Sequence, residues 1–152
     1  HIFFLLYYII LQIISMETVI LKTLKYQISL PTAHTFLFRY LNAAHTYREL
    51  TFLTQFILET SLYSYELVTK YSPSQLAAAA VLIGRKAVGR NSWSPTLLKD
   101  PEYRGEDIKP IARVMLAENK NLRSSLTAVK RKYHNEKYLK VARIMLPTES
   151  EL

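Results

Sequence analysis

The side chains that could do acid–base or metal chemistry are few and far apart in this sequence. The histidines stand at positions 1, 34, 45 and 134, and none has another histidine at metal-ligand spacing. The chain has no cysteine, which excludes disulfides, thiolate metal sites and cysteine nucleophiles. Glu59 and Glu66 share one predicted helix, but no second pair of carboxylates faces them. We therefore expect no catalysis, no metal, no cofactor and no small-molecule substrate.

One segment has the outline of a phosphate-binding loop, GRKAVGRN at residues 84–91. In a true phosphate-binding loop the second glycine is followed by Lys and then Ser or Thr, and a strand precedes the loop. Here Arg90 and Asn91 follow Gly89, and no strand-like run precedes Gly84. We reject a nucleotide site at this position.

Residues 72–89 have the pattern of a helix with both ends marked. Ser72 can cap its first turn, Pro73 suits its first position and Gln75 completes a capping box. Gly89 can adopt the left-handed conformation that ends a helix. The run between these ends is uncharged over two turns, so no face of it prefers water. We predict a buried central helix, and its hub residues are Ser72, Pro73, Gln75, Leu76, Ala77, Ala78, Ala79, Ala80 and Ile83.

The rest of the chain also favours helices, because glycines are few and apolar residues recur at helical spacing. Nothing strand-like has a partner, so the predicted fold class is all-α. Thr46 and Glu49 have the spacing of a capping box, and Ser124 and Asn135 can each cap a later helix. Pro110 is acceptable only in the first turn of its helix. We expect helices at 16–25, 31–44, 46–67, 106–119, 126–133 and 135–144, one turn at 96–98, an extended connector at 26–30 and a frayed tail at 148–152.

Residues 1–14, HIFFLLYYIILQII, are almost wholly apolar. They are fewer than the roughly 20 residues that a membrane-crossing helix needs. They also lack the basic start and the small-residue cleavage site of a secretory signal. We interpret residues 1–15 as a truncated or mis-started terminus and expect this segment to promote aggregation. A membrane-anchored adaptor is a third reading of the chain.

The net charge of +8 favours acidic partners or nucleic acid. No base-reading motif accompanies the basic residues, so we interpret them as a solvated face, and a helical nucleic-acid-binding or scaffold module is the alternative function. RVML at 113–116 and RIML at 143–146 resemble degradation signals, but we expect both to be mid-helix packing. The dense basic residues of the last third are Lys120, Arg123, Lys130, Arg131, Lys132, Lys137, Lys140 and Arg143.

Several stretches, in order along residues 16–147, resemble the C-terminal half of a B-type mitotic cyclin. The resemblance implies a five-helix cyclin fold around the alanine-rich helix, with one or two extra helices at the N-terminus. Its implied domains are the last helix of the N-terminal cyclin box with a linker (16–29), the C-terminal cyclin domain (30–147) and a tail (148–152). The matching stretches are Met16-Glu17, Ile20-Leu21-Lys22-Thr23-Leu24, Leu30-Pro31-Thr32, Phe36-Leu37, Tyr40-Leu41, Tyr71-Ser72-Pro73-Ser74, Trp93, Tyr103, Lys130-Arg131-Lys132-Tyr133 and Lys137-Tyr138.

The same resemblance implies a partner, a cyclin-dependent Ser/Thr kinase that acts in the control of mitotic cell-cycle progression. Cyclins push the glutamate-bearing helix of that kinase inward and reorder its activation loop, mostly through the N-terminal box. By position, the kinase-facing residues of the family correspond here to Glu17, Leu21, Tyr26 and Ile28. Leu21 and Ile28 could instead pack between the two boxes. With most of that box missing, we expect a weak activator, located in the nucleus and cytoplasm.

Overall fold

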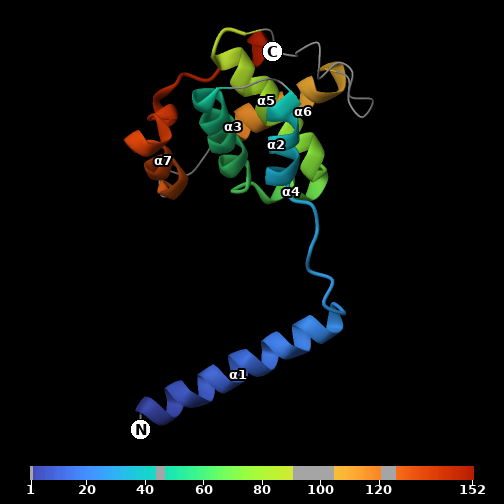
Figure 1. Cartoon of the computed structure of the whole chain (residues 1–152), viewed down its shortest axis with the longest axis vertical. Helices are drawn as coiled ribbons and strands as arrows, with labels where there is room; N and C mark the ends of the chain where they lie inside the picture. Colours follow the sequence, from blue (N-terminus) through green and yellow to red (C-terminus); the bar gives the residue numbers. More distant parts are fainter. Residues whose placement is uncertain (1, 44–46, 91–104, 121–125) are drawn as a thin grey trace. The chain divides into compact units, whose positions relative to one another are not determined.

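The structure is a computed structural model that describes residues 2–43, 47–90, 105–120 and 126–152. The chain divides into two compact units, His1–Leu30 and Pro31–Leu152 (Figure 1). The described residues form helices and contain no strand, which confirms the all-α prediction. The predicted turn at 96–98, and Trp93 and Tyr103 of the family resemblance, lie outside the described residues.

The first unit is built on a single helix, α1 (Ile2–Thr23). The apolar run and the segment that follows Met16 therefore belong to one continuous helix. Phe3–Thr23 is long and apolar enough to cross a membrane by length and composition, so the argument that this segment is too short is wrong. After the helix, Lys25 and Tyr26 adopt left-handed backbone angles (φ 50° and 58°) and turn the chain.

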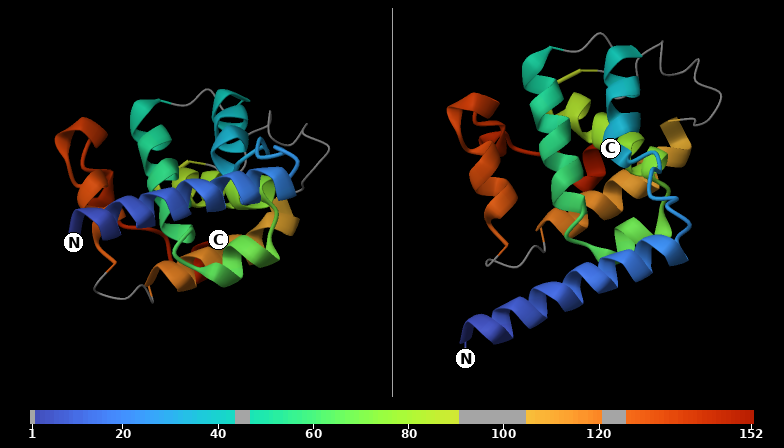
Figure 2. Two further views of the ribbon diagram at one scale, coloured as in Figure 1. Left: turned by 90° about the horizontal axis from the view of Figure 1, so that it is seen from below. Right: turned by 60° about the horizontal axis from the view of Figure 1, so that its bottom comes forward.

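The second unit packs its helices around α5 (Pro73–Ala87), which contacts α2, α3, α4 and α6. Figures 1 and 2 show α5 in the middle of this group. The predicted central helix is thus confirmed. The other helices of the unit are α2 (Ala33–Ala43), α3 (Arg48–Ser61), α4 (Tyr65–Lys70), α6 (Gly105–Lys120) and α7 (Ala128–Tyr133), followed by the 3₁₀ turns η2 (Glu136–Tyr138), η3 (Val141–Arg143) and η4 (Glu149–Glu151).

Both ends of α5 have the predicted caps. Ser72 Oγ accepts from the backbone N–H of Gln75 at 3.3 Å, and Gln75 Oε1 accepts from the backbone N–H of Ser72 at 2.9 Å. Gly89 has φ +70°, the left-handed conformation that a side chain would disfavour. Between the caps, Ala77 to Ala80 are each 0% exposed, and Leu76 and Ile83 are also buried. The capping residues Ser72, Pro73 and Gln75 stay at or near the surface.

Helices α3 and α5 approach each other closely at Gly84. A Cβ added to Gly84 would lie 2.6 Å from Thr54 Cγ2 and 3.2 Å from Leu50 Cδ1. Real Cβ atoms are almost never closer than 3.0 Å to another heavy atom. The missing side chain of Gly84 is therefore what allows α3 to pack at this distance.

The predicted helix at 46–67 is wrong in its continuity, because α3 ends at Ser61 and α4 begins at Tyr65. The hydroxyl groups of Thr60 and Ser61 donate to carbonyls of the last turn of α3. Such bonds compete with continuation of the helix. Ser64 then caps α4 by accepting from the backbone N–H of Leu67. Thr46 lies outside the described residues, and the N-cap position belongs to Tyr47.

Further predictions about helix ends need correction. Pro110 lies inside α6, beyond its first turn, where it removes one backbone hydrogen bond. Ser124 lies outside the described residues, and Thr127 occupies the N-cap of α7. The tail does not fray: η4 has a capping box formed by Thr148 and Glu151, and it contacts α6.

The predicted helix at 135–144 is also wrong. Asn135 caps as expected, since its Oδ1 accepts from the backbone N–H of Lys137 at 2.9 Å. It opens only the short turn η2, and Leu139 and Lys140 then have φ of 55° and 53°. Two consecutive left-handed residues cannot continue a right-handed helix. The segment is therefore split into η2 and η3.

Candidate functional site

The candidate kinase-facing residues lie on α1 and on the turn after it. Glu17 and Leu21 are four positions apart, which places them on one face of α1. Glu17 is exposed, and Leu21 is the least exposed residue of that helix face. Tyr26 and Ile28 follow the helix and are 63% and 64% exposed.

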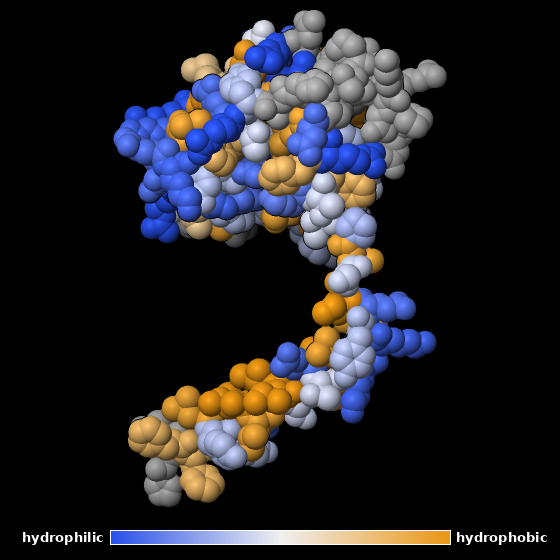
Figure 3. All heavy atoms as spheres, viewed as in Figure 1, coloured by the Kyte–Doolittle hydropathy of each residue, from blue (hydrophilic) through white to orange (hydrophobic). Residues whose placement is uncertain are grey.

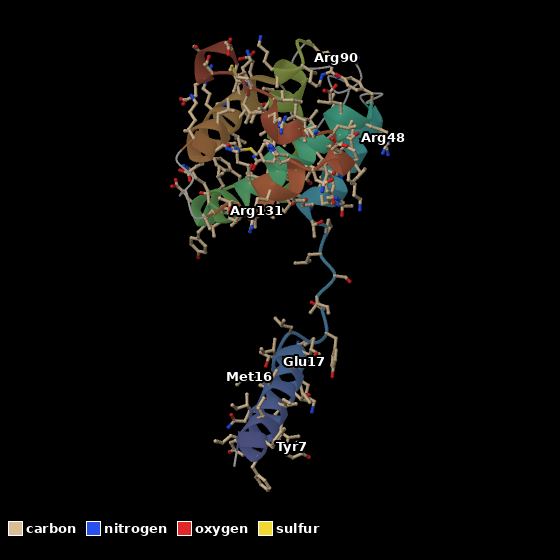
Figure 4. All side chains as sticks on the ribbon, turned by 90° about the vertical axis from the view of Figure 1, so that its left-hand side faces the viewer. Tyr7, Met16, Glu17, Arg48, Arg90 and Arg131 are labelled. Atoms are coloured by element: carbon tan, nitrogen blue, oxygen red, sulfur yellow. The ribbon has the colours of Figure 1, made fainter. Side chains whose placement is uncertain are left out.

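The surroundings of Glu17 on α1 are apolar. Ile13, Met16, Glu17, Ile20 and Leu21 together line a shallow hollow along the helix. Met16 and Glu17 project from α1 in Figure 4. One carboxylate beside exposed aliphatic side chains suits a protein partner that offers a basic group within an apolar surface. The assignment of these residues to a kinase interface stays a prediction.

The two described histidines of the second unit have structural partners. Among the described residues, no three His, Asp or Glu side chains are placed to hold a metal ion. His34 packs edge-on against Phe38 at 4.8 Å between ring centroids. His134 Nε2 accepts from Arg143 at 3.1 Å. His1 and His45 lie outside the described part of the chain.

The two carboxylates of the predicted long helix are likewise engaged separately. Glu66 pairs with Lys70 at 3.8 Å on α4. Glu59 instead binds Lys132 and Tyr133 of α7. No paired-carboxylate site forms from these two residues, because each is held by its own partners.

The cluster of Glu59, Lys132 and Tyr133 joins α3 to α7. Lys132 Nζ donates to both carboxylate oxygens of Glu59, at 2.7 and 2.9 Å, and Tyr133 Oη donates to Glu59 Oε1 at 2.7 Å. Burial, and then the hydrogen bond to Glu59, raise the pKa of Tyr133 far above its ordinary value. The sequence gives no sign of this cluster, because Glu59 is more than 70 positions away from its partners.

Several of the basic residues that we interpreted from the sequence as a solvated face form ion pairs in the structure. Lys132 pairs with Glu59, and Lys140 pairs with Glu136 at 2.6 Å. Lys130 and Arg131 are exposed on α7. In Figure 3 the α7 side of the second unit, at the left of the view, is covered mainly by hydrophilic residues. Arg123 lies outside the described residues.

The two candidate degradation motifs differ in structure. Met115 and Leu116 are buried in α6, so residues 113–116 serve core packing as predicted. Residues 143–146 do not lie mid-helix: Arg143 ends η3, and Met145 beyond it is 89% exposed.

The segment with the outline of a phosphate loop forms no loop at its first glycine. Gly84 and Arg85 belong to α5. The side chain of Arg85 is buried, and this desolvation lowers its pKa. A buried guanidinium inside a helix is not positioned to cradle phosphate, which supports the rejection of a nucleotide site.

Known proteins similar to this chain agree with the helical architecture. The family model "Cyclin, C-terminal domain" matches residues 31–147. Cyclin-B2-1 of Oryza sativa subsp. japonica is 40% identical over 129 residues, which cover 84% of this chain and 30% of that protein. G2/mitotic-specific cyclin-A of Drosophila melanogaster is 33% identical over 132 residues, covering 86% and 27%. Cyclin-A2-3 of Arabidopsis thaliana is 33% identical over 144 residues, covering 90% and 32%.

The chain thus spans about a third of the length of these relatives. The matched residues 31–147 lie within the second unit, which contains the alanine-rich helix α5 and the helices around it. Both B-type and A-type cyclins are among the relatives. Cyclins are regulatory proteins and not enzymes, in agreement with the expectation of no catalysis. The chain belongs to the cyclin family.

Proposed function

We propose that this chain acts as part of a mitotic cyclin, a regulatory subunit that binds a cyclin-dependent Ser/Thr kinase in the control of mitotic progression. The observation that carries the proposal is the family match over residues 31–147 together with relatives named as G2/mitotic-specific cyclins. The proposed location of the protein is the nucleus and cytoplasm, where it would bind such a kinase.

The proposed contact is made by Glu17, Leu21, Tyr26 and Ile28. The exposure of Glu17, Tyr26 and Ile28 supports this assignment, since two large side chains and a carboxylate are accessible on one short stretch. Apolar and aromatic residues of this kind supply most of the energy of protein interfaces. Glu17 adds a charge that can select a basic group on the kinase.

The second part of the proposal is that the chain is a weak activator by itself. The resemblance assigns most of the kinase contact to an N-terminal box, of which residues 16–29 correspond to the last helix only. Interface energy concentrates in a few central residues, and each 1.4 kcal/mol that is lost weakens binding about tenfold. A chain that offers four contact residues should therefore bind with low affinity and leave the activation loop poorly ordered.

The test measures binding and activation of a purified cyclin-dependent kinase by the full chain at physiological salt. We expect weak, saturable binding that falls about tenfold for Leu21→Ala or Ile28→Ala, with little kinase activity gained. Tyr65→Ala is the matched control, because Tyr65 is 81% exposed on α4, far along the chain from these residues. Tight binding with full activation would refute the weak-activator part. Binding that both Ala variants leave unchanged would refute the assigned contact.

A further inference from the structure

We propose that the concave surface between α3, the end of α6 and α7 binds an acidic peptide segment that inserts one large apolar side chain, a Leu or a Phe. This surface lies wholly within the second unit and uses none of the four kinase-facing candidates. It is therefore a second interaction site, with a partner of different chemistry.

The apolar part of the site is a hollow of about 450 Å³. Its apolar walls include Phe56 of α3, Leu126 before α7, and Ile144 and Leu146 of the C-terminal segment. Leu126 is 38% exposed, and Ile144 and Leu146 are partly exposed. A hollow of this size with aliphatic and aromatic walls accommodates a side chain such as Leu or Phe.

The rim of the hollow is cationic. Lys120 and Lys130 both line it, and both are exposed. A second hollow of about 410 Å³ shares Thr127 and Lys130 with the first and continues along α7 past Arg131 and His134. Residues 126–147 contain six Lys or Arg and a single acidic residue, which is paired with Lys140. Both hollows are therefore in a positive field that attracts carboxylates.

The chain itself places a carboxylate at this rim. Glu149 Oε1 lies 4.0 Å from Lys120 Nζ, and the two side chains are 50% and 58% exposed. An exposed pair at such a distance contributes little to stability, so another carboxylate can replace Glu149 at small cost. The contact shows the kind of group that this edge of the hollow accepts.

The combination of hollow and charge favours a peptide over a nucleic acid. Nucleic-acid binding needs cations that follow a regular phosphate backbone, and bases are held by stacking or by edge contacts. Here the cations surround an apolar hollow instead, and Phe56, the one aromatic residue among the described residues that line it, is buried at 6% exposure. A buried ring of this kind can pack against an inserted aliphatic side chain but offers no open face on which a base could stack.

The experiment uses the full chain, kept monodisperse by mild detergent, and fluorescence anisotropy with three probes. The first is a labelled peptide with a Leu-Phe pair between runs of glutamate. The second has the same charge but Ser-Gly in place of Leu-Phe, and the third is a single-stranded oligonucleotide of equal length. We expect the Leu-Phe peptide to bind at least tenfold more tightly than the other two at physiological salt.

Variants separate the two parts of the site. Lys130→Glu should weaken the Leu-Phe peptide about tenfold, and Leu126→Gln should weaken it several-fold while leaving the Ser-Gly peptide unchanged. Arg113→Glu is the matched charge reversal, since Arg113 is exposed on α6 and lines neither hollow. Equal loss in Arg113→Glu, or equal binding of the two peptides, would reduce the effect to net charge and overturn the proposal. Tighter binding of the oligonucleotide would overturn it in favour of nucleic acid. Failure of the Leu-Phe peptide to bind would also overturn it.

Discussion

Tyr133 on α7 donates its hydroxyl hydrogen to Glu59 on α3, with 2.7 Å between the two oxygens, while the tyrosine ring is only 1% exposed. The ring also packs at 5.5 Å from Phe56, centroid to centroid. One residue thus connects α7 to the helix group both through the core and through a hydrogen bond to a charged group. We infer that α7 stays folded mainly through these contacts of Tyr133, because a helix of its length is too short to be stable alone.

Tyr133→Phe keeps the ring and removes the hydrogen bond. Hydrogen bonds to charged groups contribute about 1.5–3 kcal/mol, so the free energy of unfolding should fall by roughly that amount. Denaturant unfolding at neutral pH measures it, with Tyr65→Phe, at an 81% exposed position, as the control expected to change nothing. Equal stability of the Tyr133→Phe variant and the parent would show that the bond to Glu59 contributes nothing.

Tyr133 should also make stability depend on alkaline pH. Burial, and then the hydrogen bond to Glu59, raise its folded-state pKa well above the ordinary value of 10.0. In the unfolded chain the same group loses its proton near pH 10. The folded state therefore holds more protons above that pH, so this contribution is complete below about pH 10 and is lost as the pH rises toward the folded pKa.

The measurement is urea unfolding at several pH values from neutral to about 11, on the parent and on Tyr133→Phe. Other tyrosines titrate in both proteins, so only the difference between the two curves is informative. We expect that difference to shrink as the pH rises above about 10. A difference that stays constant over this range would mean that the folded pKa of Tyr133 is not raised.

Gly84→Ala tests the close approach of α3 and α5. Alanine is favoured over glycine inside a helix by about 1 kcal/mol, so propensity alone predicts stabilisation. The added Cβ would lie 2.6 Å from Thr54 Cγ2, however, and overpacking of this kind costs about 1–3 kcal/mol. We expect net destabilisation, measured by thermal or denaturant unfolding.

A second substitution identifies the cause. Thr54→Ser removes Cγ2 and retains the hydroxyl, which donates to the backbone carbonyls of Leu50 and Thr51 at 2.9 Å each. In the Thr54→Ser background, Gly84→Ala should lose most of its cost, giving a coupling of about 1–2 kcal/mol in the double-mutant cycle. Additive effects of the two substitutions would place the strain elsewhere.

The alanine run in the middle of α5 is another place where the packing leaves no room for extra atoms. Ala78 and Ala79 are 0% exposed, so Ala78→Leu or Ala79→Leu forces three extra carbons into a packed region. The expected loss is about 1–3 kcal/mol. Ala128→Leu, at an exposed position on α7, adds the same atoms where space is open and should leave the melting temperature near that of the parent. Identical melting of all three variants would mean that α5 is not the packing centre.

Much of the second unit follows from local rules that the sequence displays. Ser72, Pro73 and Gln75 form the start of α5 through contacts within one helical turn, so a pattern of three residue types was enough to predict it. The burial of Ala77 to Ala80 follows from the absence of charge on any face. Both predictions depend on residues that are neighbours in the chain.

Other features do not follow from residues that are neighbours in the chain. The bond from Tyr133 to Glu59 joins positions 74 apart, and no local pattern predicts such a pair. The split of 135–144 into η2 and η3 depends on left-handed angles at Leu139 and Lys140, which neither side chain favours and which tertiary packing must impose. The candidate kinase contacts came from resemblance alone, because exposed residues such as Tyr26 and Ile28 carry no periodic signal of their own.

The last prediction concerns α1. The described side chains of α1 are exposed except for Leu21, which is partly buried, and much of the side of the helix that is visible in Figure 3 is orange, the colour of hydrophobic residues. Exposed apolar surface of this extent drives association in water. We expect the full chain to form large species in detergent-free buffer and to become monodisperse in mild detergent, as measured by light scattering. Leu6→Lys with Ile13→Lys should remove the detergent dependence, because each Lys interrupts the apolar surface.

A matched control introduces two lysines at exposed apolar positions outside α1. Leu62 and Met145 are exposed in the second unit, so Leu62→Lys with Met145→Lys should leave the detergent dependence intact. Flotation with lipid vesicles then distinguishes aggregation from membrane anchoring. Because Phe3–Thr23 has the length of a bilayer-spanning helix, co-flotation of the parent that the α1 variant loses would support the membrane-anchored reading. A parent chain that is monodisperse without detergent would contradict the prediction.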